Sequence, residues 1–344
     1  MVNCPPGIID VEANSSAEKY EVAPLAKAMN EAFIAICLAF GPMPPILSAF
    51  RTSQNIIQAV PPNSSPLLQL PHITPSIAQA IEGEYSKKHL TVQQFMEMPE
   101  YQRRKLATDQ AGTLTPKQYN DAMSVARQIP LLKVEKVFFK VVGEKYITPG
   151  SLVQFVCKAR VIPPGTANVP DVIEADLEDI DPEEDDLDGL LGRKPPKNSR
   201  PKTTDGSTSP AAAVQQPPLA YAPYFARDHA PRWHMFLAES KQNRVAVPPT
   251  SIQTFSKPIF DEAGRPTFNM QTMKLTFQAP PTAGSYTFAM HLICDSYVGM
   301  DSRVDATLVI EDSGKAREIT SEEEISEPDE GTCSLHPPHT MMSN

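Results

Sequence analysis

A short segment around the only tryptophan is the strongest constraint on what this chain can fold into. Trp233 lies in an apolar stretch, 231–238, which is followed by six polar residues and a second apolar triplet beginning at Val245. This pattern predicts a β-hairpin. Two strands alone cannot bury an indole, so further strands must cover Trp233. We therefore expect a structural role for Trp233 in the core of a β-domain.

Strand patterns occur on both sides of this hairpin. Apolar residues alternate with polar ones in 134–142 and 153–161, and again in three runs between 273 and 310. A period of two is typical of strands with one buried face. The total of about seven short strands is that of an immunoglobulin-like or fibronectin type III-like sandwich, and Tyr286 resembles the structural tyrosine corner of such folds. We predict a sandwich formed by residues 131–162 and 217–312.

Residues 163–216 separate the two parts of the predicted sandwich. Eleven Asp and Glu residues and no Lys or Arg lie in 171–188, and a basic, then Ser/Thr/Pro-rich, stretch follows. Such a composition buries too little apolar surface to offset the entropy of the chain. We expect a disordered acidic insertion, with leucine and isoleucine side chains that dock on a partner. Alternatively, its acidic and basic halves pair with each other.

Residues 16–130 are predicted to form a helical domain, preceded by a disordered N-terminus, 1–15. One helix carries apolar residues at three-to-four spacing, which we expect to form a buried stripe: Leu25, Met29, Ala32 and Ile36. Core packing is also the expectation for Phe33 and Phe50. The longest uninterrupted apolar run, 32–40, is well below the roughly 20 residues that cross a bilayer, so no membrane span is expected.

The part of this helical domain at about 67–107 resembles a helix-hairpin-helix. Thr91 and Gln94 have the spacing of a capping box, and Thr115 with Gln118 repeats it. Such hairpins can bind phosphate at their glycine turn. Here Glu82 and Glu84 flank Gly83, and their charges would repel a phosphate. The whole chain is thus predicted to be multi-domain α + all-β.

Charge and cysteine content indicate the class of partner and the compartment. The net charge is −10, but removing the eighteen acidic residues of 171–188 and 318–330 leaves +8 on the rest of the chain. The two acidic segments should therefore bind basic partners. The five cysteines form no C-x-x-C pair, which favours a reducing compartment. We expect Cys157 and Cys294 to be free buried thiols.

No arrangement of residues points to catalysis. The chain has no phosphate-binding glycine loop, no nucleophile elbow and no zinc-protease motif, and its seven histidines lack metal-ligand spacing. We therefore expect a protein that is not an enzyme, with no catalytic residue, no metal and no cofactor.

The C-terminal tail, 313–344, carries the second acidic run. Three hydroxyl residues each precede an acidic residue by three positions, the pattern that an acidophilic kinase recognises: Thr320, Ser321 and Ser326. Phosphorylation there would deepen the negative charge of the tail and strengthen contact with a basic partner.

Five segments resemble the cytosolic region of the Sec sixty-three family, in its fungal form. They are 64–72, 138–145, 176–183, 226–234 and 294–299, within a similarity that runs from about 20 to 330. That family contains the J-domain subunit of the endoplasmic-reticulum translocon for post-translational import. Its membrane helices and J domain have no counterpart in this sequence. We therefore expect a fragment or a truncated gene model, with the chaperone BiP as a partner only where a J domain precedes it.

The resemblance implies location on the cytosolic face of the endoplasmic-reticulum membrane and two protein partners. The sandwich would dock on cytosolic loops of the protein-conducting channel. The acidic tail would bind a basic segment of the Sec sixty-two protein through Glu322, Glu323, Glu324, Glu327, Asp329 and Glu330. As an alternative, a similar helical-plus-sandwich cassette occurs in spliceosomal RNA helicases, where it would serve nucleic-acid binding. The acidic insertion disfavours that function, and no nucleic acid is expected as a partner.

Loop aromatics are the residues most expected to contact the channel. A few large anchors dominate protein interfaces, and binding residues concentrate on loops. We predict contacts from Phe255 and Ser256, and from Tyr221 and Tyr224 upstream of the hairpin.

Overall fold

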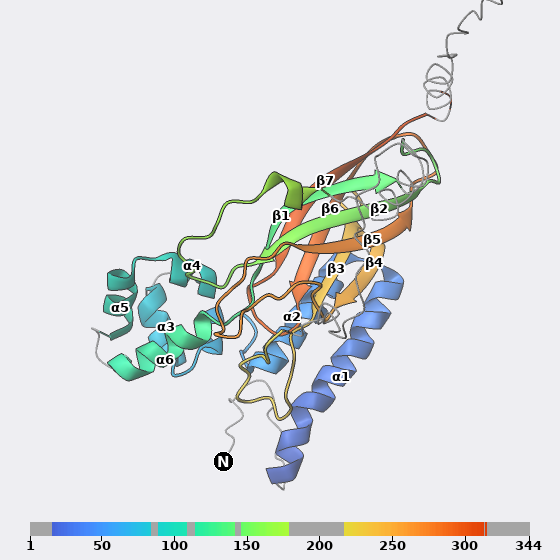
Figure 1. The fold of residues 1–344 in the computed structure, drawn as a ribbon. Coiled ribbons are helices and arrows are strands. Elements are labelled where there is room, and N and C mark those ends of the chain that lie inside the picture. Colours follow the sequence, from blue (N-terminus) through green and yellow to red (C-terminus); the bar gives the residue numbers. More distant parts are fainter. Residues whose placement is uncertain are drawn as a thin grey trace, which may run out of the picture.

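The protein consists of a set of helices followed by two antiparallel sheets (Figure 1). The structure is a computed structural model that describes residues 16–83, 89–108, 114–141, 146–178, 217–312 and 314. Most of the acidic insertion and nearly all of the tail lie outside these ranges.

Seven strands form the β-domain, in the regions where the alternating patterns predicted them. One sheet has the order β1-β2-β5, and the other has the order β4-β3-β6-β7. The strands are β1 (Leu132–Val141), β2 (Leu152–Val161), β3 (Trp233–Glu239), β4 (Arg244–Ile252), β5 (Gln271–Gln278), β6 (Gly284–Cys294) and β7 (Ser302–Ile310). The predicted hairpin is β3 with β4, in which Glu239 pairs with Arg244.

The core of the β-domain lies between the two sheets. Phe155 and Cys157 face it from β2, while Trp233 and Cys294 face it from β3 and β6. Trp233 is 1% exposed. Both cysteines are free and buried, as predicted, and burial raises the pKa of Cys157 to about 12, so its thiol stays protonated.

Tyr286 makes the bond expected of a tyrosine corner at the start of β6. Its hydroxyl donates to the carbonyl of Thr282 at 3.1 Å and also contacts the Thr282 hydroxyl. The bond ties the loop before β6 to the strand itself.

Four short helices and a 3-10 turn make up the middle of the helical region. They are η1 (Pro66–Gln69), α3 (Pro75–Glu82), α4 (Val92–Glu97), α5 (Glu100–Thr108) and α6 (Pro116–Ala126). The capping boxes at Thr91 and Thr115 are both confirmed. Gly83 ends α3 with φ +88°, a conformation that favours glycine.

The first two helices, α1 (Ser16–Phe40) and α2 (Met43–Gln58), pack on the outer face of the four-stranded sheet (Figure 1). Phe50 of α2 stacks on Phe236 of β3 with ring centroids 5.9 Å apart and contacts His234 at 5.0 Å. Ile34 and Cys37 of α1 complete this second apolar cluster.

The predicted buried stripe of α1 is wrong. Leu25, Met29 and Ile36 are all more than half exposed, and Phe33 is exposed as well, whereas Phe50 is buried as expected. The side of α1 that faces the protein carries Ala23, Lys27, Ile34 and Cys37. A buried lysine lowers the apolarity of that side, so hydrophobic spacing alone selected the wrong face.

One described helix is long and apolar enough to cross a membrane, contrary to the expectation from the sequence. Residues Val22–Phe40 of α1 number 19, with a mean hydropathy of 1.5, and satisfy that requirement by length and composition. Lys27 and Glu31 interrupt the stretch, which is why counting uninterrupted apolar residues missed it. Only 17% of the stretch is buried.

The helical region and the sandwich meet at the segment that follows β6. Three glutamines reach it from the helices: Gln54 Nε2 donates to the Cys294 carbonyl at 2.8 Å, Gln58 Nε2 to the Ser296 carbonyl at 2.6 Å, and Gln69 Nε2 to the Val298 carbonyl at 3.0 Å. The Val298 amide in turn donates a hydrogen bond to Gln69 Oε1 at 3.1 Å. These bonds satisfy backbone groups of an irregular, buried segment.

Asp295 is the charged centre of this junction. Its buried carboxylate accepts from Ser296 Oγ at 2.6 Å, from the Arg232 amide and side chain at 3.1 Å each, and from His229 Nε2 at 3.2 Å. Lys27 Nζ of α1 lies 3.8 Å away. Burial by itself would raise the pKa of Asp295, but the bonds from His229, Ser296 and Arg232 outweigh it and hold that pKa well below its usual range.

Asp295→Asn should lower the free energy of unfolding by about 3 kcal/mol, because it removes the anion from a buried group of cations. Urea unfolding at pH 7 measures this loss. Since the folded pKa is depressed, the carboxylate stabilises the protein fully above the unfolded pKa of about 3.9, and this contribution fades on further acidification. The difference between wild type and variant should therefore shrink below about pH 4.

Asp305→Asn is the matched control, since Asp305 pairs with Arg303 on the surface and both side chains are more than half exposed. Its loss of stability should stay below about 1 kcal/mol. Equal losses for the two variants would show that the Asp295 network does not join the helices to the sandwich.

Candidate docking surfaces

Phe255 does not have the exposed position predicted for a channel contact. Its side chain is 2% exposed and meets the Trp233 indole edge-on, with ring centroids 5.3 Å apart. It belongs to the core of the sandwich, because the loop after β4 folds inward over Trp233. Ser256, its neighbour, is exposed and lies 3.4 Å from Gln271 Oε1 through its hydroxyl.

The two tyrosines upstream of the hairpin differ in exposure. Tyr221 is half-buried, and its backbone amide donates to the Tyr297 hydroxyl at 3.3 Å. Tyr224 is 44% exposed. Of the three predicted loop aromatics, Tyr224 is therefore the one placed to meet a partner. The tail residues predicted to bind a partner or to be phosphorylated lie outside the described residues.

The outward side of α1 forms an apolar surface that the sequence analysis missed. Five large side chains on it are 50–70% exposed, and we call them the α1 face: Leu25, Met29, Phe33, Ile36 and Phe40. Their spacing of three or four residues places them on one side of the helix. Contiguous apolar patches of this kind mark interaction sites on soluble surfaces. The signal was present in the sequence, but it was interpreted as core.

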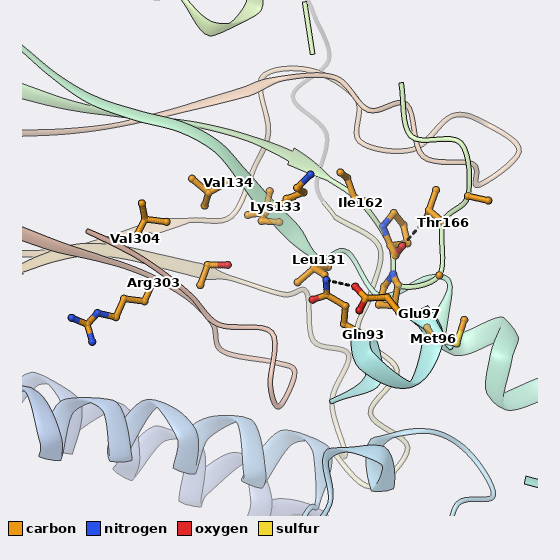
Figure 2. Close-up of a pocket in the computed structure, with 16 residues that line it drawn as sticks. Gln93, Met96, Glu97, Leu131, Lys133, Val134, Ile162, Thr166, Arg303 and Val304 are labelled. Atoms are coloured by element: carbon orange, nitrogen blue, oxygen red, sulfur yellow. Dashed lines mark hydrogen bonds between the residues drawn. The ribbon is translucent and has the colours of Figure 1, made fainter. Parts of the chain in front are cut away.

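A cleft of about 620 Å³ lies where α4, the start of β1, the loop after β2 and β7 come together (Figure 2). Glu97, Lys133 and Arg303 are its charged lining residues, and Gln93 Nε2 donates to Glu97 Oε1 at 2.9 Å. The lining contains neither His nor Cys. Figure 2 shows apolar side chains such as Leu131 and Ile162 beside these polar ones. A lining that mixes apolar and charged side chains can accommodate a peptide side chain.

Within the part of the chain that the structure describes, no group of three or more His, Cys, Asp or Glu side chains is placed to hold a metal ion. The candidate functional sites among the described residues are the surfaces on which a partner could dock.

Comparison with known proteins shows which proteins this chain is similar to. No protein-family model matches the chain. Translocation protein sec63 of Schizosaccharomyces pombe is 26% identical over 317 residues, which make up 90% of this chain and 46% of that protein. The chain is thus similar to a translocation protein over most of its own length. It spans less than half the length of that relative.

Weaker matches join the chain to a second group. Two DExH-box ATP-dependent RNA helicases of Arabidopsis thaliana, DExH12 and DExH13, are 22% and 21% identical over 89% of the chain. The matched region is 11% of each helicase. The same stretch of sequence thus has relatives of two different kinds.

Three of the five segments that carry the Sec sixty-three resemblance meet at the junction described above. Segment 64–72 supplies Gln69, segment 226–234 supplies His229 and Arg232, and segment 294–299 holds their partners Asp295 and Val298. Gly299 lies in this joint at φ +79°, a backbone conformation that favours glycine. The resemblance is therefore concentrated in the joint between helices and sandwich.

Phe255→Ala should cost about 3 kcal/mol of folding stability, as for other buried aromatic truncations, because it opens a cavity beside Trp233. Tyr224→Ala should change stability by less than about 0.5 kcal/mol. Chemical denaturation followed by Trp233 fluorescence measures both. If Phe255→Ala were as stable as wild type, the loop would not be part of the core.

Proposed function

We propose that this chain is a non-enzymatic adaptor of the endoplasmic-reticulum protein translocation machinery, on the cytosolic face of the membrane. The observation that carries the proposal is the match to a translocation protein over 90% of the chain. That share is too large to be confined to either the helical region or the β-domain.

The α1 face is the proposed contact with the protein-conducting channel. Its five apolar side chains offer a continuous surface, and large apolar anchors provide most of the binding energy in protein interfaces. Tyr224 is a second, smaller anchor. The arrangement of strands in sheets of three and four supports the fibronectin type III-like reading of the domain that presents these surfaces.

The acidic tail is the proposed contact with a basic partner, the Sec sixty-two protein in the related family. Its support is charge alone, since seven acidic residues lie in 318–330 without a Lys or Arg. Phosphate on Thr320, Ser321 or Ser326 would strengthen this contact.

A second candidate function is an accessory module for nucleic-acid binding, and the two helicase matches favour it. The helix-hairpin-helix-like region argues against it. Glu82 beside the glycine turn accepts from Ser65 Oγ at 2.5 Å, from the Leu90 amide at 3.0 Å and from His89 Nδ1 at 2.9 Å. A carboxylate fixed at this turn would repel a phosphate there.

Met29→Glu combined with Phe33→Glu should weaken binding of the full chain to purified protein-conducting channel by at least about tenfold, the size expected when anchors of an interface are lost. The melting temperature should stay unchanged, because both side chains are exposed. Binding is measured with the channel in nanodiscs, to separate contact with protein from insertion into detergent.

Tyr101→Glu combined with Val309→Glu provides a matched control, since both residues are large, apolar and exposed on other elements. This control should bind as wild type. Equal binding by all three proteins would place the contact elsewhere. Absence of channel binding, together with salt-dependent RNA affinity below micromolar, would favour the nucleic-acid function.

A further inference from the structure

The outer face of the three-stranded sheet is basic. On β2 the side chains of Val153, Phe155 and Cys157 face the core, so the alternate positions face outward. In the strand register, Lys136 of β1 pairs with Lys158 of β2, and Val156 lies between Phe138 and Lys274. We call this surface the lysine face: Lys136, Phe138, Lys140, Val156, Lys158 and Lys274.

The charge of this surface is positive over most of its area. Glu135 is the sole acidic residue in the three strands, and it lies at one end, where Arg160 donates to it at 2.6 and 2.9 Å. Like charges directly opposite each other on neighbouring strands are destabilising, as for Lys136 and Lys158. Lys158 is only 5% exposed, and its Nζ donates to Thr272 Oγ1 at 2.9 Å. The lysine face therefore favours an anionic occupant.

Burial shows that the centre of the face is covered, although Lys136 near its edge is exposed. Val156 points away from the space between the sheets, yet it is 0% exposed. It belongs to neither of the two hydrophobic clusters that make up the described core. The aliphatic parts of the lysines and the ring of Phe138, with Lys136 Nζ 5.4 Å from the ring centroid, supply an apolar floor around it.

We propose that the acidic run of the insertion, residues 179–188, docks on the lysine face of its own chain. The described residues after β2 lead toward this run. Arg160 Nη1 of β2 donates to the Pro170 carbonyl at 2.7 Å. The short 3-10 turn η2 (Glu174–Leu177) is followed by Glu178, which directly precedes the acidic run. The run carries seven acidic residues together with Ile180 and Leu187. Acidic side chains match the lysines, and the two apolar ones match Val156 and Phe138.

Length agrees with this assignment. Ten extended residues reach about 33 Å at roughly 3.3 Å per residue, the length of a ten-residue strand such as β2. A short tether also gives an effective concentration on the order of millimolar, so the insertion outcompetes free ligands of similar affinity. An acidic protein partner binds the lysine face only by displacing the insertion. This inference does not depend on the translocation role.

The test compares the full wild-type chain with a full-length variant in which the seven acidic residues of 179–188 are changed to Asn or Gln. The probe is a fluorescein-labelled peptide of residues 176–190, followed by fluorescence anisotropy at 0.15 M salt. The neutralised variant should bind the peptide at least tenfold more tightly than wild type. Adding Lys136→Glu and Lys274→Glu to the neutralised variant should abolish binding.

Lys117→Glu with Lys241→Glu, two exposed lysines on other elements, forms the matched control and should leave peptide binding unchanged. Circular dichroism confirms that each protein is folded. Equal peptide affinity of wild type and neutralised variant would overturn the proposal. So would retention of binding after reversal of Lys136 and Lys274. A tail peptide, 318–330, that binds more tightly, or RNA that competes more strongly than the peptide, would assign the face to that ligand instead.

Discussion

The buried carboxylate of Asp295 is the interaction on which the arrangement of the molecule depends. It lies where β6 ends and binds Arg232 and His229, just before β3 begins, while Lys27 reaches it from α1. A charge so deeply buried is tolerated only with several partners. Here they come from α1, from the segment before β3 and from Ser296 beside Asp295 itself. The network therefore joins the two central strands of one sheet to the first helix.

One consequence concerns the orientation of α1. Because Lys27 must face Asp295, its side of the helix, with Ala23, Ile34 and Cys37, faces inward, and the large apolar residues point to solvent. The two sheets pack face to face, so α1 and the lysine face lie on opposite outer sides of the sandwich (Figure 1). The sandwich thus carries an apolar surface on one side and a basic surface on the other.

Local rules made most of the fold predictable. Alternation located the strands, and Thr91 and Thr115 with their glutamines located two helix starts, because these patterns act over a few residues. The inward face of α1 was not predictable, since it depends on Asp295, which is 268 positions from Lys27 in the chain. The prediction that Phe255 is exposed was wrong for a similar reason: nothing near it in sequence shows that its loop folds over Trp233.

The sequence segments that resemble other proteins do not by themselves indicate which function this chain has. The segments that carry the resemblance hold the joint together: Gln69 binds Val298, and Arg232 binds Asp295. A joint of this kind serves any protein built from these helices and this sandwich, and the matches to a translocation protein and to RNA helicases are consistent with that.

Surfaces have to distinguish the two functions. A nucleic-acid module needs an accessible basic face. In this chain Val156 and Lys158 at the centre of the basic face are buried, Lys136 is exposed, and the accessible large side chains of α1 are apolar. Those surfaces favour a protein partner.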